Sequence, residues 1–88
     1  MNIQPALAAR VNAVLADVLG LSPDRIALMT PQTPLFGAMP ELDSMAVAGL
    51  LTEIEDQFQI RIDDDDVNGD LLETVGSLTA YVASKMAK

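Results

Sequence analysis

The stretch PELDSMAVAGLL, from Pro40 to Leu51, places two acids and a serine directly before a run of apolar residues. Such side chains are favoured at helix N-termini, where an oxygen accepts a hydrogen bond from an otherwise unpaired backbone N–H. The stretch therefore predicts a helix that begins at Ser44, with Asp43 and Ser44 as its cap. A second interpretation stays open, in which the Ser44 hydroxyl lies at the positive end of a helix, where a phosphate binds readily.

The predicted helix runs from Ser44 to about Gln59, because apolar residues recur on one face at the helical period. That face carries Val47, Leu50, Leu51, Ile54 and Phe58. The opposite face shows a methionine and a glycine where surface helices usually show charged residues. We therefore expect a partner-binding surface that comprises Met45, Gly49, Thr52, Glu53 and Asp56.

The rest of the chain predicts further helices. Apolar spacing predicts a first helix over Ile3 to Leu19, and Thr74 is placed to cap a last helix whose negative end suits Lys85 and Lys88. A short helix of about two turns is predicted around Asp64 to Leu72. Together these elements predict an all-α fold, a small four-helix bundle of three main helices plus one short helix, in a single domain over residues 1–88.

A long loop joins the first two main helices, from Leu21 to Asp43. Its four prolines exclude one long helix, although Pro23 to Met29 could form a short helical turn. Long ordered loops tend to be functional. We expect four apolar side chains to attach this loop to the core, namely Leu28, Met29, Leu35 and Phe36.

The amino-acid composition limits the classes of function that the chain can have. The 88 residues contain no Cys and no His, which excludes disulfides, a thiolate nucleophile and the commonest general base, so we do not expect an enzyme. Thirteen acids face five bases, a balance that repels nucleic acid and anionic membranes and attracts basic partners. The N-terminus lacks the pattern of a signal peptide, and no run is long enough to span a bilayer, so we expect a cytoplasmic protein without membrane insertion.

One acidic stretch, DDDVNGDL from Asp64, partly matches a calcium-binding EF-hand loop. Asp64, Asp66 and Asn68 fall at loop positions one, three and five. The match fails at position twelve, which is Val75 where a bidentate Glu is required. Weak divalent binding at these three residues remains an alternative, in which the chain is a small acidic helical module that binds calcium or a protein partner without any prosthetic group.

The chain resembles the acyl carrier proteins over nearly its whole length. Asp43-Ser44-Met45 resembles their Asp-Ser-Leu motif, and Phe36 lies at the family's usual distance before the serine. EIEDQF, from Glu53 to Phe58, and TVGSLTAYV, from Thr74 to Val82, resemble parts of the second and last helices of the family. The chain departs from the family at three kinds of position. Met45 replaces the usual Leu, Glu41 stands where many members have Gly, and Ala46 and Gly49 replace acids of the carriers of fatty acid synthesis.

The resemblance implies a carrier function. A phosphopantetheinyl transferase would move 4′-phosphopantetheine from coenzyme A to Ser44, with Asp43 as its motif neighbour. The thiol of that arm would hold acyl groups as thioesters for acyl-transfer or acyl-ligase enzymes with basic docking patches. We expect a monomer that serves fatty acid, polyketide or surface-polymer biosynthesis.

Overall fold

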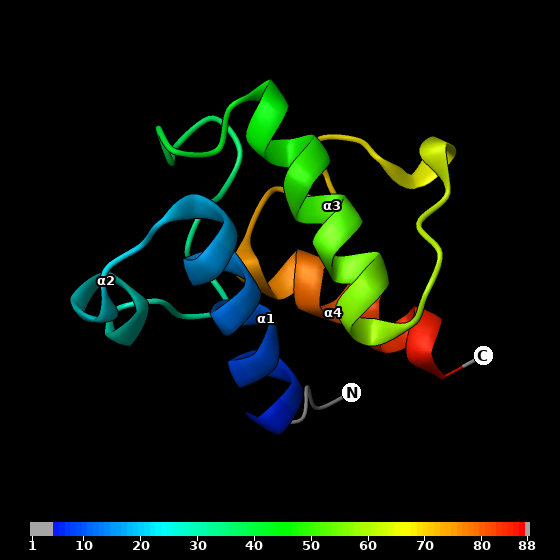
Figure 1. The fold of residues 1–88 in the computed structure, drawn as a ribbon, viewed down its shortest axis with the longest axis horizontal. Helices are drawn as coiled ribbons and strands as arrows, with labels where there is room; N and C mark the ends of the chain where they lie inside the picture. The colour runs from blue at the N-terminus through cyan, green and yellow to red at the C-terminus, as the bar shows by residue number, and fades with distance from the viewer. Residues whose placement is uncertain (1–4, 88) are drawn as a thin grey trace.

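The computed structural model describes residues 5–87, whose fold is built from helices (Figure 1). In chain order the elements are α1 (Pro5–Leu19), α2 (Pro23–Ala27), α3 (Ser44–Phe58), the 3₁₀ helix η1 (Asp64–Asp66) and α4 (Val75–Met86). Within the described residues there is no strand, only an isolated antiparallel bridge between Pro34 and Thr74. The predicted all-α fold is therefore confirmed, with four α-helices and a long connection before α3. The predicted helix start at Ile3 lies outside the described residues.

The core lies where α1 meets α3 and α4 (Figure 1). Each of these three helices contributes side chains that are wholly shielded from solvent. They are Val11 and Leu15 from α1, Leu50 and Ile54 from α3, and Leu78 and Val82 from α4. Burying one such side chain contributes about 1.5–3 kcal/mol, so this cluster stabilises the position of α3 against its neighbours.

The helix ends follow the sequence signals. The first helix ends at Leu19, as predicted: Gly20 has a φ of 67°, and the Leu21 N–H returns to the Ala16 carbonyl oxygen at 3.1 Å. At the start of α4, Thr74 and Ser77 form a reciprocal capping box. The predicted cap of the last helix is therefore confirmed.

The helix predicted around Asp64 to Leu72 is wrong in its extent. Only η1 is helical, and turns follow it up to Thr74. The Asn68 side-chain oxygen accepts the Leu71 N–H at 3.0 Å, which offers the backbone an alternative to helical hydrogen bonds. The short α-helix of the fold is instead α2, inside the connection that precedes α3, where a short helical turn was predicted.

The predicted anchoring of the long loop is correct for two side chains and wrong for the other two. Leu35 is wholly buried and Met29 is partly buried, whereas Leu28 is 80% exposed and Phe36 is 51% exposed. The Leu35 N–H donates to the Glu73 carbonyl oxygen at 3.0 Å, and the Phe36 N–H donates to that of Leu72 at 2.9 Å. The Leu35 carbonyl oxygen accepts the N–H groups of Ala38 and Met39, so the chain turns directly after Leu35, which faces the core while Phe36 faces solvent.

None of the helices in residues 5–87 has the length and apolar character needed to cross a membrane.

Candidate functional site at the start of α3

Asp43 alone caps α3. Its side-chain oxygen Oδ1 accepts the Ala46 N–H at 2.8 Å, and its backbone is extended, as an N-cap requires. Ser44 is the first residue inside the helix and is exposed. The prediction that Ser44 shares in the cap is therefore wrong. The helix start that was predicted from the same residues is confirmed.

The position of Ser44 suits a phosphorylated group. The first N–H groups of a helix have no partner within the helix, and the helix dipole adds a partial positive charge at that end. Of those groups, the Ala46 N–H is taken by Asp43. A phosphodiester on the Ser44 hydroxyl would lie beside the remaining N–H groups of the first turn, which favour negative charge.

A cavity of about 270 Å³ opens beside Ser44. Three segments line it: the α1–α3 connection, α3 and the α3–α4 connection. The lining residues are Phe36, Ser44, Val47, Val67, Asn68, Gly69 and Leu72. Most of these side chains are apolar, and the Asn68 oxygen already accepts the Leu71 N–H. The cavity can therefore accommodate an apolar group next to a hydroxyl.

An ion pair fixes the segment just before Ser44. The guanidinium of Arg25, on α2, donates to the Glu41 carboxylate. This hydrogen bond is the main cause that lowers the pKa of Glu41 below its ordinary value. Glu41 stands where many carriers have a glycine, so here that position is occupied by a carboxylate that Arg25 partly neutralises.

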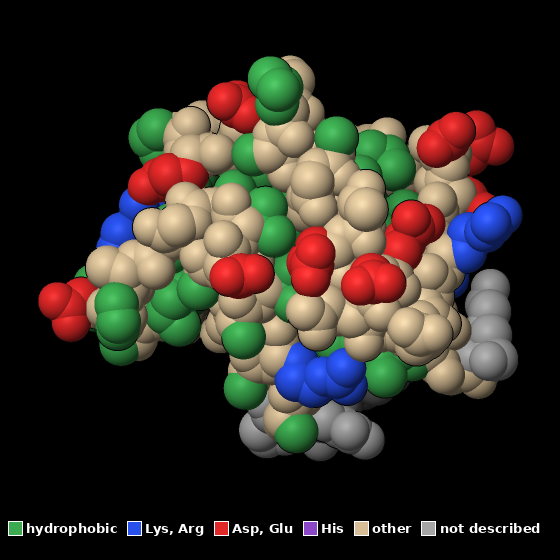
Figure 2. Space-filling model, in the orientation of Figure 1, with side chains coloured by type: hydrophobic (Ala, Val, Ile, Leu, Met, Phe, Trp, Pro, Cys, Tyr) green, Lys and Arg blue, Asp and Glu red, His purple; other side chains and the backbone are tan. Residues whose placement is uncertain are grey.

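The predicted partner-binding surface lies on the outer face of α3. Met45 is 85% exposed, and Gly49, Thr52 and Asp56 are exposed as well, with Glu53 half-buried beside them. Figure 2 shows acidic side chains gathered over the C-terminal half of α3. The structure thus brings these residues together on one face, with an apolar end near Ser44 and an acidic end away from it.

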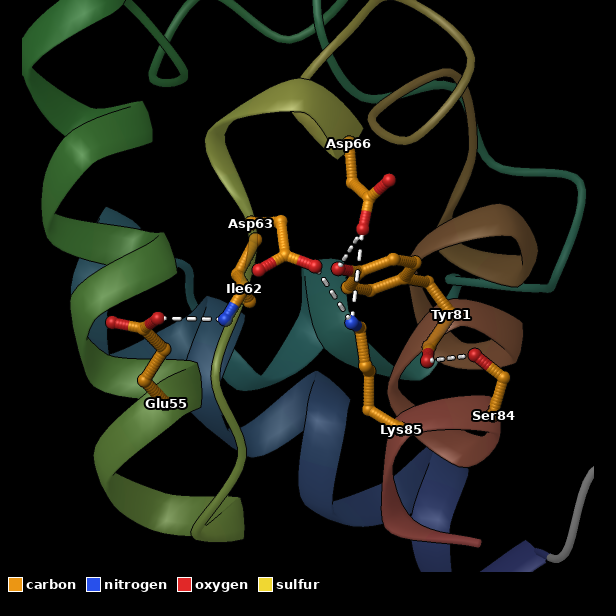
Figure 3. Close-up of polar contacts among 7 residues, drawn as sticks. All are labelled: Glu55, Ile62, Asp63, Asp66, Tyr81, Ser84 and Lys85. Carbon is orange, nitrogen blue, oxygen red and sulfur yellow. Dashed lines mark hydrogen bonds and ion pairs between the residues drawn. The ribbon is translucent and has the colours of Figure 1, made fainter. Parts of the chain in front are cut away.

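Two of the three candidate calcium ligands, Asp66 and Asn68, are engaged in contacts within the protein. The Tyr81 hydroxyl donates to Asp66 Oδ2 at 2.7 Å, and the Lys85 ammonium lies 3.8 Å from the same atom (Figure 3). Asn68 is bonded to Leu71, and Asp64 is exposed. Within residues 5–87 no three His, Cys, Asp or Glu side chains are arranged to bind a metal ion.

Lys85 has a partner that the sequence did not indicate. It was predicted to interact with the end of its own helix, but its ammonium contacts Asp63 Oδ2 at 3.2 Å, 22 residues away along the chain. That hydrogen bond raises the pKa of Lys85, and burial is the main cause that raises the pKa of Tyr81. Lys88 lies outside the described residues.

The sequence did not point to three of the cavity-lining residues. Val67 and Gly69 lie in the acidic stretch that partly matches a calcium loop, and only the folded chain brings them and Leu72 to Ser44. The Arg25–Glu41 pair joins residues 16 positions apart, beyond the reach of any local pattern.

The geometry agrees with comparisons to known proteins. Residues 9–82 match the family described as phosphopantetheine attachment site, and the chain belongs to this family of phosphopantetheine-binding carrier proteins. Among solved structures, the holo acyl carrier protein of Nitrosomonas europaea, determined by solution NMR, is similar, with 39% identity and a TM-score of 0.84. The match covers 97% of this chain and 100% of that one. A comparison with curated proteins found no match.

These findings define what the protein does. It is an acyl carrier protein and not an enzyme, and it bears a covalently attached 4′-phosphopantetheine. It works together with enzymes that handle acyl groups.

Proposed function

We propose that Ser44 is the residue that bears the phosphopantetheine. A comparison of the four serines of the chain supports this assignment. The hydroxyl oxygens of the other three are engaged: Ser22 accepts the Arg25 N–H, Ser77 closes the capping box of α4, and Ser84 donates to the Tyr81 carbonyl. Among the hydrogen bonds of residues 5–87, none uses the Ser44 hydroxyl, which is exposed at the start of a long helix.

The attachment step needs a separate transferase. The Ser44 oxygen forms a bond to the pantetheine phosphorus of coenzyme A, the pyrophosphate bond breaks, and adenosine 3′,5′-bisphosphate leaves. The chain contains no His or Cys, so a phosphopantetheinyl transferase supplies the base that takes the hydroxyl proton. Once attached, the arm provides the thiol on which acyl groups are carried as thioesters. Because the step consumes coenzyme A, we place it in the cytoplasm.

The cavity beside Ser44 is proposed to receive an apolar acyl group. Its lining is largely apolar and includes the serine from which the arm would extend. Transfer of apolar surface out of water favours this location by about 25 cal/mol per Å². A polar or very short acyl group would gain less and would stay in solvent.

Partner enzymes are proposed to dock on the outer face of α3. The acids Glu53 and Asp56 would attract basic patches on a partner, and Met45 would add an adaptable apolar contact near the serine. Ala46 and Gly49 stand where carriers of fatty acid synthesis have acids, which favours partners from polyketide or surface-polymer biosynthesis over the standard fatty acid enzymes. We propose that the carrier meets these partners as a monomer.

Intact mass spectrometry tests the attachment site. Incubated with coenzyme A and a broad-specificity transferase, the wild-type chain and the control variant Ser22→Ala should each gain the mass of one phosphopantetheine. Ser44→Ala should gain nothing while its circular dichroism stays that of the wild type. A full mass gain in Ser44→Ala would disprove the assignment.

A further inference from the structure

The α3–α4 connection contains an acid run, Asp63–Asp66, that side chains of α4 bind from one side (Figure 3). The Lys85 ammonium lies 3.2 Å from Asp63 Oδ2 and 3.8 Å from Asp66 Oδ2. The Tyr81 hydroxyl donates to Asp66 Oδ2 at 2.7 Å. These two residues of α4 therefore fix the end of η1, although η1 itself has no buried residue.

The next three residues of the chain form part of the cavity beside Ser44. Val67, Asn68 and Gly69 line it and are all exposed, and the chain returns to the core only at Leu71 and Leu72. These three residues, the outer wall of the cavity, lie between two attachments along the chain. The polar contacts of Asp66 come before them, and the buried side chains of Leu71 and Leu72 come after them. A segment with few buried contacts of its own opens easily, so its position depends on its attachments.

Because the acid run is highly charged, its attachment to α4 is sensitive to the loss of a positive partner. Four consecutive carboxylates repel one another, and both ion pairs that the run forms within residues 5–87 go to Lys85. The Lys85 side chain is 18% exposed, but the carboxylates of Asp63 and Asp66 are 62% and 40% exposed, so water and salt partly screen these contacts. Removal of the ammonium would leave the repulsion in place and free the chain that leads into the wall.

We propose that Lys85 and Tyr81 are positioning residues for the Ser44 cavity: they fix Asp63 and Asp66, and thereby keep Val67–Gly69 in place as its outer wall. This proposal rests on the proposed function, because the wall matters only if an acyl group carried from Ser44 enters the cavity. Neither residue touches the arm, and neither is needed for its attachment. Their effect is on whether an apolar acyl group stays in the cavity or lies in solvent.

Hydrogen exchange on the unmodified full chain tests the wall directly. In Lys85→Met and in Tyr81→Phe, exchange of the hydrogen-bonded amides that border the wall, those of Asp66, Val67 and Leu71, should be faster than in the wild type, while exchange in the core of α3 stays unchanged. Lys85→Arg keeps the positive charge and should keep the wild-type rates. Ser84→Ala, which removes a hydrogen bond to the Tyr81 backbone carbonyl but leaves the side-chain contacts of Tyr81 and Lys85 in place, is the matched control. Wild-type exchange rates at all three amides in both Lys85→Met and Tyr81→Phe would overturn the proposal.

The second test measures how well the cavity protects a thioester. The chain is loaded from acetyl- or octanoyl-coenzyme A, and the rate of cleavage by hydroxylamine is divided by that of the matching free acyl-coenzyme A. The octanoyl form of the wild type should be protected and the acetyl form should not. Lys85→Met and Tyr81→Phe should lose the octanoyl protection, and Lys85→Arg should retain it.

The outcomes separate this proposal from the proposed function. Absence of any mass gain during loading would contradict the function, and the inference would fall with it. Normal loading with no octanoyl protection in the wild type, or with full protection in both Lys85→Met and Tyr81→Phe, would overturn the inference alone. Tyr81→Phe deletes a single oxygen, so it still decides the matter if Lys85→Met fails to fold.

Discussion

The two long connections of the fold meet at the Ser44 cavity, but they are attached to the protein in different ways. The α1–α3 connection is bound largely through its backbone. Leu35 and Phe36 donate to the carbonyl oxygens of Glu73 and Leu72, and the Thr33 and Pro31 carbonyl oxygens accept N–H groups from the first residues of α4. Wholly buried Leu35 adds an apolar anchor. This connection, the fixed connection of the fold, therefore holds the start of α3 in place.

The first part of the α3–α4 connection, before Leu71, is bound largely through side chains. Glu55 accepts the Ile62 N–H at 2.7 Å, and Lys85 and Tyr81 bind Asp63 and Asp66. Charged contacts of this kind respond to pH and ionic strength, whereas backbone contacts beside a buried leucine do not. We therefore expect the cavity to have one constant wall, formed by the α1–α3 connection, and one adjustable wall, formed by residues 67–69.

The largest expected loss of stability comes from a substitution in the fixed connection. Leu35→Ala should lower the free energy of unfolding by about 2–5 kcal/mol, because it removes a wholly buried side chain and leaves a cavity. Denaturant unfolding measures the change. The neighbouring control Phe36→Ala should lower the free energy of unfolding by only about 1 kcal/mol, since that ring is half exposed. Equal losses for the two variants would contradict the described orientation of this segment.

A smaller loss is expected where the fixed connection meets α4. A Cβ atom added to Gly76 would lie 2.8 Å from the Pro31 carbonyl oxygen, so Gly76→Ala should destabilise the fold by about 1–3 kcal/mol despite the better helix propensity of Ala. Gly69→Ala is the matched control in the adjustable wall, because nothing lies within 4 Å of its added Cβ. A stabilised Gly76→Ala would show that the two segments are not in close contact.

The two connections should also differ in their response to pH. The pKa values of Lys85 and Tyr81 are raised in the folded state, so their contribution is full below the ordinary values of 10.5 and 10.0 and is lost as pH rises through the folded values. The pKa of Glu41, in the fixed connection, is lowered, so its contribution is present above the ordinary value of 4.5 and is lost as pH falls.

Denaturant unfolding across pH measures this difference. Lys85→Met should flatten the loss of stability on the alkaline side, and Arg25→Gln should flatten the loss on the acidic side. The assignment of these groups to the two connections would be wrong if Lys85→Met changed the loss of stability at acidic pH instead, or if Arg25→Gln changed the loss at alkaline pH.

The smallest effect on stability is expected at the outer face of α3. Met45 is 85% exposed, so Met45→Glu should change the free energy of unfolding by about 0.5 kcal/mol or less. It should nevertheless slow acyl transfer by a cognate partner enzyme, measured as kcat/KM. Gln32→Glu makes the same charge change on the exposed surface of the fixed connection and should leave transfer unchanged. A large loss of stability in Met45→Glu would place Met45 in the core.

The sequence predicted the features that arise from local interactions. The start of α3, its buried face, the capping residue of α4 and the glycine after α1 depend on neighbours within a few positions, and all are confirmed. The exposed face of α3 followed from the same helical period. The prediction that Ser44 shares the cap failed because Asp43 and Ser44 are both suitable caps, and only the backbone geometry shows which of them takes that position.

The features that the sequence missed depend on contacts between distant segments. The outward turn of Phe36 follows from backbone bonds to Leu72 and Glu73, which no apolar pattern reveals. The partners of Lys85 and the lining by Val67 and Gly69 likewise exist only once α3 and α4 are packed. The position of Ser44 at the start of α3 could thus be predicted from the sequence, but the cavity beside it could not.

Peptide mapping of the loaded wild-type protein tests the assignment of Ser44 most directly. Trypsin cleaves after Arg25 and Arg61, and the peptide between these cuts contains Ser44 as its single serine. After incubation with coenzyme A and a transferase, the account predicts that this peptide alone gains the mass of one phosphopantetheine, with fragment ions that place it on Ser44. A gain on the peptide that contains Ser22, or on the one that contains Ser77 and Ser84, would contradict the account.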